Sequence, residues 1–144
     1  MTTTTLSCAA CNTANRVPTD RLGDKPKCGK CKEPILQGQP LEMTSANVNN
    51  VLGGNSVPVL VDCWAPWCGP CRSFAPIFTQ AAQQLEPRLR FAKLNTEDEQ
   101  QLAGSWGIQS IPTLILFRDG QEQARMSGAM PLGQLKQWLL QNGV

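Results

Sequence analysis

The chain has 144 residues, a length suited to one domain of ordinary size plus a small appendage. A net charge of +2, with 17% charged residues, gives no reason to expect a nucleic-acid or membrane partner, and no apolar run could span a bilayer. Histidine is absent, which excludes Cys-His and Ser-His nucleophile pairs and any metal site with mixed cysteine and histidine ligands. The start, MTTTTLSC, lacks the features of a secretory signal, so we expect a cytoplasmic protein whose seven cysteines are reduced.

Residues 7 to about 40 show neither helical nor strand periodicity and are rich in turn residues. A segment this short cannot bury much core, so it needs disulfides or a bound metal to hold it folded. Its cysteines form two Cys-x2-Cys pairs, Cys8 with Cys11 and Cys28 with Cys31. Pairs at this separation can bring four thiolates to one tetrahedral ion, so we predict a four-cysteine zinc site in a domain over residues 1–40. Two disulfides or a rubredoxin-like iron site are the alternatives. A nucleic-acid-binding role is not expected, because the segment has no aromatic residue to stack on bases.

Residues 41–144 show the regular periodicities of a second domain. The expected elements, in chain order, are a strand over 41–43, a short helix capped by Thr44 and reaching Leu52, a strand over 57–64, a helix from 68 to 85, a strand over 89–94, a helix over 96–103, strands over 113–117 and 123–126, and a helix over 131–139. Thr96 and Glu99 have the spacing of a capping box, and Pro76 should kink the long helix. This order predicts an α/β fold with a mixed sheet and helices on its faces.

Cys68 and Cys71 lie where a predicted strand meets a predicted helix, in WAPWCGPCR. Cys68 is expected at the helix N-terminus, where the helix dipole and free amide groups favour a thiolate, and Cys71 follows one turn later within disulfide reach. A metal site would need two further ligands, and a structural disulfide is disfavoured in a reducing compartment. The pair is therefore predicted to be a redox-active dithiol.

The segment VDCWAPWCGPCRSFAPIF resembles the active-site segment of thioredoxins. The resemblance extends from about residue 41 to the C-terminus and includes FAKLNTE and GIQSIPTLILF. With the four-cysteine extension, the chain is similar to the zinc-containing thioredoxins of bacteria, the thioredoxin 2 group. The resemblance implies a thioredoxin fold over residues 41–144, a small N-terminal zinc-ribbon-like domain, and activity as a protein-disulfide reductase.

The same resemblance implies roles for four residues. Cys68 is expected to be the nucleophile and Cys71 the resolving thiol. Asp62 matches the buried acid beneath the pair and would accept the Cys71 proton, while Lys93 matches the lysine that tunes this acid. A carboxyl group in an apolar strand should have a raised pKa; the alternative for Asp62 is a surface position at a strand end.

Four further residues are expected to bind substrate. Pro112 matches the family's cis-proline, and a cis bond after Ile111 would present a backbone edge to an extended substrate. Trp67 and Gly128 match the apolar surface around the dithiol. An ordinary trans proline at position 112 is the alternative.

Position 63 departs from the family pattern, because it is Cys where the family usually has an aromatic residue. Strand alternation makes Cys63 face away from Asp62. We interpret it as a small core residue without a redox role.

The expected partners are disulfide-containing protein substrates and a thioredoxin reductase that draws electrons from NADPH. The main alternative function is a redox sensor or holdase, in which oxidation releases zinc from the N-terminal cysteines. A thiol oxidase is a third hypothesis, which the expected cytoplasmic location argues against.

Overall fold

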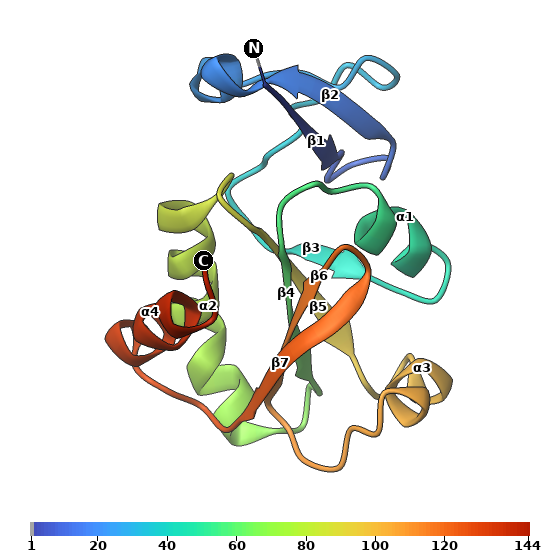
Figure 1. Ribbon diagram of the computed structural model, residues 1–144. Helices are drawn as coiled ribbons and strands as arrows, with labels where there is room; N and C mark the ends of the chain where they lie inside the picture. Colours follow the sequence, from blue (N-terminus) through green and yellow to red (C-terminus); the bar gives the residue numbers. More distant parts are fainter. Residues whose placement is uncertain (1) are drawn as a thin grey trace.

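The computed structural model describes residues 2–144, which form a small N-terminal part (residues 2–40) and a larger C-terminal part (residues 41–144) (Figure 1). The N-terminal part holds β1 (Thr3–Ser7), β2 (Ala14–Pro18) and the 3-10 helix η1 (Thr19–Asp24). The C-terminal part holds β3 (Leu41–Met43), α1 (Val48–Gly53), β4 (Val59–Trp64), α2 (Gly69–Leu85), β5 (Arg90–Asn95), α3 (Gln100–Ser105), β6 (Thr113–Arg118), β7 (Gln121–Ser127) and α4 (Leu132–Gln141).

The C-terminal part is built on a five-stranded mixed sheet with the strand order β3-β5-β4-β6-β7. Strands β3, β5 and β4 run parallel, whereas β6 is antiparallel to β4 and β7 is antiparallel to β6. The central strand β4 is a nearly continuous apolar run, as is typical of a strand that is covered on both faces. The predicted mixed sheet is therefore confirmed.

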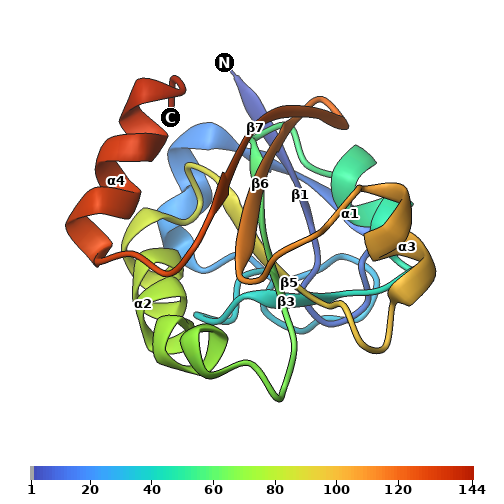
Figure 2. The same ribbon diagram turned by 90° about the horizontal axis from the view of Figure 1, so that it is seen from below.

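Helices cover both faces of this sheet (Figure 2). Helices α2 and α4 lie on one face, where Leu60, Phe74 and Phe78 belong to one buried core. Helices α1 and α3 lie on the other face, where Val61 and Cys63 belong to a second core. Because side chains alternate along a strand, β4 directs residue 62 toward α2 and residue 63 toward α1 and α3.

The N-terminal part contains regular structure that the sequence analysis did not predict. Strands β1 and β2 form an antiparallel hairpin, and η1 follows directly. Of the five residues in β2, only Val17 is buried, so the strand lacks the apolar alternation from which strands are recognised. Residues 7–40 lack sequence periodicity, yet β2 and η1 form there.

The predicted capping box before α3 is also wrong. Helix α3 begins at Gln100, and no side chain caps it. The Thr96 hydroxyl instead donates to the carbonyl oxygen of Trp64 at 3.0 Å, and the Glu99 carboxylate accepts from the backbone N–H of Ser45. Both side chains therefore bond to residues outside the helix. They connect the segment before α3 to the end of β4 and to the turn that follows β3.

Helix α1 likewise begins later than predicted, at Val48, and Asn47 stands at the N-cap position expected for Thr44. The side chain of Asn47 folds back and accepts from the backbone N–H of Thr44 at 2.7 Å, so residues 44–47 form turns. Among all the helices within residues 2–144, none is both long enough and apolar enough to cross a membrane.

Candidate active site and metal centre

The dithiol lies at the junction between β4 and α2. Cys68 is the N-cap residue of α2, and a disulfide joins it to Cys71, with their Cα atoms 5.2 Å apart. The backbone N–H of Cys71 donates to Cys68 Sγ at 3.2 Å. When the disulfide is reduced, this N–H and the positive end of the helix dipole both stabilise a thiolate at Cys68.

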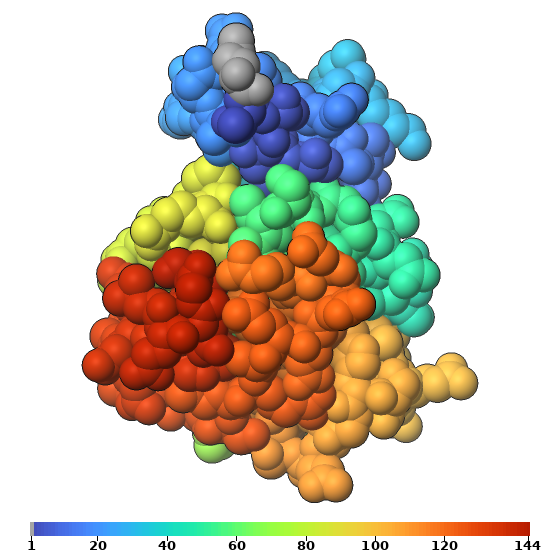
Figure 3. Space-filling model, viewed as in Figure 1, coloured from blue at the N-terminus to red at the C-terminus, as the bar shows by residue number. Residues whose placement is uncertain are grey.

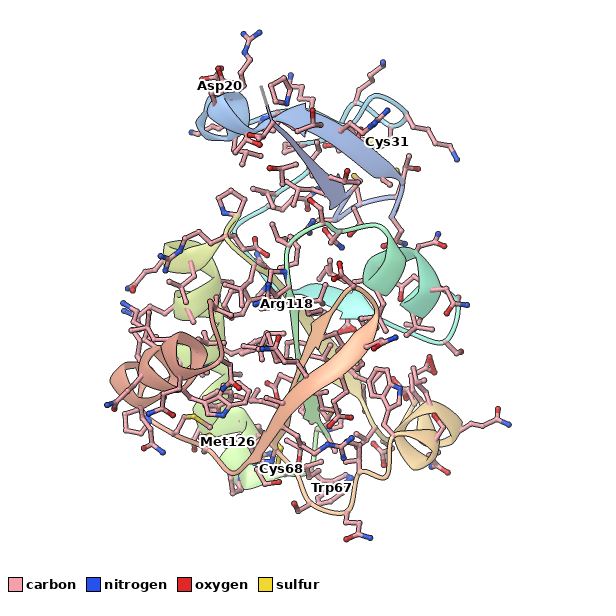
Figure 4. All side chains as sticks on the ribbon, viewed as in Figure 1. Asp20, Cys31, Trp67, Cys68, Arg118 and Met126 are labelled. Carbon is pink, nitrogen blue, oxygen red and sulfur yellow. A yellow bond between two sulfur atoms is a disulfide. The ribbon has the colours of Figure 1, made fainter. Side chains whose placement is uncertain are left out.

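The surroundings of the dithiol are apolar. Cys68 and Cys71 are buried with Ala65, and Trp64 and Ile111 pack against them. Trp67, in contrast, is 67% exposed, which is unusual for such a large apolar side chain. In Figure 4 Trp67 and Cys68 lie together at one end of the molecule.

A backbone edge from the loop before β6 borders the dithiol. The Ile111–Pro112 peptide bond is cis, as the resemblance implied, and Cys68 Sγ lies 3.8 Å from the carbonyl oxygen of Ile111. The carbonyl of Pro112 accepts from the N–H of Gly128 at 2.8 Å, and Gly128 has a φ of +100°, a conformation that glycine adopts without strain. The structure thus places Ile111 at the rim of the dithiol and connects Gly128 to the adjacent Pro112.

A shallow groove of about 310 Å³ opens beside this rim. Its walls include Trp67 and Ile111, together with Gln100 and Ala103 from α3. The exposed Trp67 therefore forms one wall of a groove that also includes Ile111, the residue that packs against the dithiol.

Asp62 is fully buried in β4. Among residues 2–144, neither of its carboxylate oxygens has a hydrogen-bond partner. Burial raises the pKa of the Asp62 carboxyl to about 7, and the positive charge of Lys93 acts in the opposite direction. The alternative of a surface position for Asp62 is wrong, and its side chain lies on the sheet face that α2 covers.

Lys93 lies beside Asp62 in the sheet, because the two residues are directly paired between β5 and β4. Its ammonium group is 4.5 Å from the centre of the Trp64 ring, a cation–π contact. Lys93 is thus held over the same face as Asp62, without a direct ion pair between them.

Cys63 is fully buried among the residues of the second core. Burial raises the pKa of its thiol to about 12, and the nearby negative charge of Asp62 adds to this effect. A thiol that stays protonated and inaccessible is a poor nucleophile. The structure agrees with the interpretation of Cys63 as a core residue.

The four N-terminal cysteines converge on one point, with their sulfur atoms all within 4.8 Å of one another. The Sγ atoms of Cys8 and Cys31 are 3.6 Å apart, as are those of Cys11 and Cys28. Tetrahedral zinc with Zn–S bonds of about 2.3 Å would separate its sulfur ligands by about 3.8 Å. None of the four is disulfide-bonded within the described chain, so the alternative of two disulfides has no support.

The two cysteine pairs sit in turns of the same geometry. The carbonyl of Cys8 accepts from the N–H of Asn12 at 2.9 Å, and that of Cys28 accepts from the N–H of Lys32 at 3.0 Å. Asn12 and Lys32 both have a positive φ, of 66° and 68°. This repeated turn directs both thiols of each pair toward the common centre.

Polar groups around Cys28 favour a thiolate at this position. The backbone N–H of Lys30 and the side-chain amide of Asn15 both donate to Cys28 Sγ at 3.4 Å. The backbone N–H of Cys31 and the Asn15 amide lower the pKa of Cys28 to about 6. Asn15 could not be predicted as a member of this site, since one polar residue in a stretch without periodicity carries no signal.

Comparison with known families agrees with this geometry. Residues 39–141 match the family model described as "Thioredoxin", and residues 7–33 match the one described as "Thioredoxin 2, N-terminal". The chain belongs to the thioredoxin family. It has the thioredoxin fold with an N-terminal zinc-ribbon domain, and it is a thiol-disulfide oxidoreductase.

Individual thioredoxins show the extent of the similarity. Thioredoxin C-3 of Corynebacterium nephridii is 43% identical over 132 residues, which cover 92% of this chain and 90% of that protein. Thioredoxin 1 of a Nostoc species is 44% identical over 98 residues, covering 68% of this chain and 92% of that protein. The thioredoxin of Haemophilus influenzae is 36% identical over 102 residues, covering 71% and 95% of the two chains.

Proposed function

We propose that the protein reduces disulfides in other proteins, with Cys68 as the nucleophile and Cys71 as the resolving thiol. The observation that carries this assignment is the position of Cys68 at the N-cap of α2, where the Cys71 N–H donates to its sulfur. The Cys68 thiolate attacks one sulfur of the substrate disulfide, and the other substrate sulfur leaves as a thiolate. Cys71 then attacks Cys68 Sγ, which releases the second substrate thiolate and leaves the Cys68–Cys71 disulfide.

Asp62 would take the proton that Cys71 loses in the second step. A buried carboxyl with a pKa of about 7 is partly ionised at neutral pH, so it can both accept this proton and return it. Lys93, paired with Asp62 in the sheet, would keep the pKa of Asp62 from rising further.

The substrate would lie across the rim formed by Trp67, Ile111, Pro112 and Gly128. The cis bond turns a backbone edge toward the dithiol, and an extended substrate segment could pair with that edge. Exposed Trp67 would supply apolar contact area. Such a surface recognises backbone and apolar groups, which suits a reductase of many disulfide-containing proteins.

The oxidised protein must be recharged with two electrons. We propose that a thioredoxin reductase using NADPH supplies them and that the protein works in the cytoplasm, where thiols are kept reduced. Gly69 and Pro70 between the cysteines resemble the reducing members of the superfamily, which argues against a thiol oxidase.

We further propose that residues 1–40 form a zinc-binding domain and that residues 41–144 form the catalytic domain. Cys8, Cys11, Cys28 and Cys31 would hold Zn²⁺, and their sulfur spacing fits a tetrahedral ion. Because four protein ligands close the coordination sphere, the ion would stabilise structure without contacting substrate.

The test of the reductase is NADPH consumption in the presence of thioredoxin reductase and a disulfide-bonded protein. The wild type should consume NADPH, whereas Cys68→Ser should not. Cys71→Ser should instead accumulate a mixed disulfide, detectable by mass spectrometry. Activity in Cys68→Ser would contradict the assignment of the nucleophile.

One observation supports the zinc-release sensor as a second function. Cys8 and Cys28 are buried, but Cys11 and Cys31 are partly exposed, so an oxidant could reach one thiolate of each pair. Oxidation of the four thiolates to two disulfides by two molecules of hydrogen peroxide would remove all four ligands. Peroxide titration with a zinc indicator tests this, and zinc that stays bound until the protein unfolds would rule the sensor out.

A further inference from the structure

A buried ion pair lies where the two parts of the chain meet. Arg90, the first residue of β5, is only 1% exposed, and its Nε donates to the carboxylate of Glu86 at 3.2 Å. Burying a guanidinium is costly unless its donors are paired. Burial lowers the pKa of Arg90, and the negative charges of Glu86 and then Cys8 oppose this change. The catalytic site uses neither residue, so the pair requires another explanation.

The second partner of Arg90 belongs to the N-terminal part. Its Nη1 donates to the carbonyl oxygen of Ser7, the last residue of β1 and the neighbour of the metal-site residue Cys8. The same Nη1 lies 3.4 Å from Oδ1 of Asn55. The guanidinium therefore connects the C-terminal part directly to the backbone from which the first cysteine pair begins.

Asn55 makes two further hydrogen bonds to Ser7. Its Oδ1 accepts from the Ser7 N–H and its Nδ2 donates to the Ser7 hydroxyl, both at 2.9 Å. The Asn55 amide is itself fixed, because Nδ2 also donates to the carbonyl of Val51 in α1 at 2.7 Å. Arg90 and Asn55 thus engage the N–H, the carbonyl and the hydroxyl of Ser7. In Figure 3 the blue N-terminal part rests on the green and yellow segments.

We propose that Arg90, assisted by Asn55, is a positioning residue of the four-cysteine metal centre. It holds the backbone before Cys8 in the position from which the first cysteine pair meets the second. Arg90 lies 83 residues after Ser7 in the chain. A residue of the C-terminal part would thus contribute to the metal affinity of the N-terminal part. This inference rests on the proposed zinc site, but not on the proposed reductase activity.

The experiment is a competition titration of the zinc-loaded, full-length protein against a chromogenic zinc chelator. The double variant Glu86→Gln, Arg90→Met removes both charges and avoids an unpaired buried carboxylate. Groups that orient metal ligands typically change affinity by about 10- to 100-fold, so we expect zinc affinity to fall by that factor. Arg90→Lys, which can donate to one of the two partners, should recover part of the loss.

Arg88→Met is the matched control, because Arg88 carries the same charge two residues away but is exposed. It should bind zinc as the wild type does. Urea unfolding of the metal-free proteins separates positioning from general stability: a purely structural role would lower the unfolding midpoint and leave zinc affinity under native conditions unchanged, which would overturn the proposal.

Asn55→Ala gives a second test if the double variant does not fold, since it removes the hydrogen bonds to the Ser7 N–H and hydroxyl without breaking the ion pair. Weaker zinc binding in Asn55→Ala supports the proposal, and wild-type affinity overturns it. A wild-type protein that binds no zinc would refute the metal site itself, and this inference with it. That result is distinct from a variant that binds as tightly as the wild type, which refutes the role of Arg90 alone.

Discussion

At the scale of single residues, Asp62 couples stability to pH. Its folded-state pKa of about 7 lies above the ordinary 3.8, so its ionised form is penalised only in the folded protein. The penalty is absent well below pH 3.8, grows as pH rises, and is complete above pH 7. Asp62→Asn should therefore stabilise the protein by on the order of 4 kcal/mol at pH 8.5 and have little effect at pH 3.

Urea unfolding of the two proteins at both pH values checks this prediction. Asp119→Asn is the control, because Asp119 is an exposed turn residue whose positive φ asparagine also tolerates. An equal gain from Asp62→Asn at both pH values would show that packing is responsible, and not the buried charge.

The same carboxyl should control the second chemical step. Only ionised Asp62 can accept the Cys71 proton, so resolution of the mixed disulfide should speed up as pH rises through about 7. Asp62→Asn should slow this step by about 100-fold and remove that pH dependence. Stopped-flow measurement of a preformed mixed disulfide on Cys68 tests this. An unchanged pH profile in the variant would mean that another group accepts the proton.

Cys63 should be dispensable for turnover. Its thiol is fully buried and its pKa is raised to about 12, so it does not exchange with substrate. We expect Cys63→Ala to keep reductase activity within about twofold and to lose about 1 kcal/mol of stability through the small cavity. Activity assays and urea unfolding measure the two effects, and a large loss of turnover in a folded variant would assign Cys63 a redox role.

At the scale of elements, the positions of the dithiol and the buried acid could be predicted because their signals are local. The two cysteine spacings, the apolar run of β4 and its interruption by Asp62 are all visible within a few residues of sequence. Strand β2 could not be predicted, because its single buried residue, Val17, leaves no alternation. Its order comes instead from pairing with β1 and from the cysteine centre.

The contacts of Arg90 and Asn55 with Ser7 at the junction of the two parts also could not be predicted from the sequence. Arg90 and Ser7 are 83 residues apart, and Asn55 and Ser7 are 48 residues apart. Arg88 lies just before β5 and is exposed, whereas Arg90 is its first residue and is buried. Nothing in the local sequence Arg88-Leu89-Arg90 distinguishes the two arginines. A buried polar contact between distant residues depends on tertiary structure, so local pattern cannot reveal it.

At the scale of the whole molecule, the cluster of four N-terminal cysteines and the dithiol lie at opposite ends (Figure 4). Cys31 marks one end, while Cys68 and Trp67 mark the other. The N-terminal part therefore cannot cover the dithiol of its own chain. Its influence on catalysis would have to pass through the sheet, which Arg90 enters at the first residue of β5 and in which Lys93 faces Asp62.

Metal removal should reveal how independent the two parts are. The buried core of the N-terminal part consists of only five residues, two of them metal-site cysteines, so it should not stay folded without the ion. The C-terminal part has two large cores of its own. After chelation under reducing conditions, we expect amide protection to be lost in β1 and β2 and kept in β4 and β6, as measured by hydrogen exchange.

The start of β5 is the informative position in that experiment. Arg90 would lose its contact to Ser7 but keep Glu86, so exchange should quicken near residue 90 and remain slow near Lys93. The zinc-loaded protein under the same reducing conditions is the control. If protection disappears throughout β5 and β4, the buried junction makes the two parts one cooperative unit, and metal loss would then disable the dithiol by unfolding the sheet beneath it.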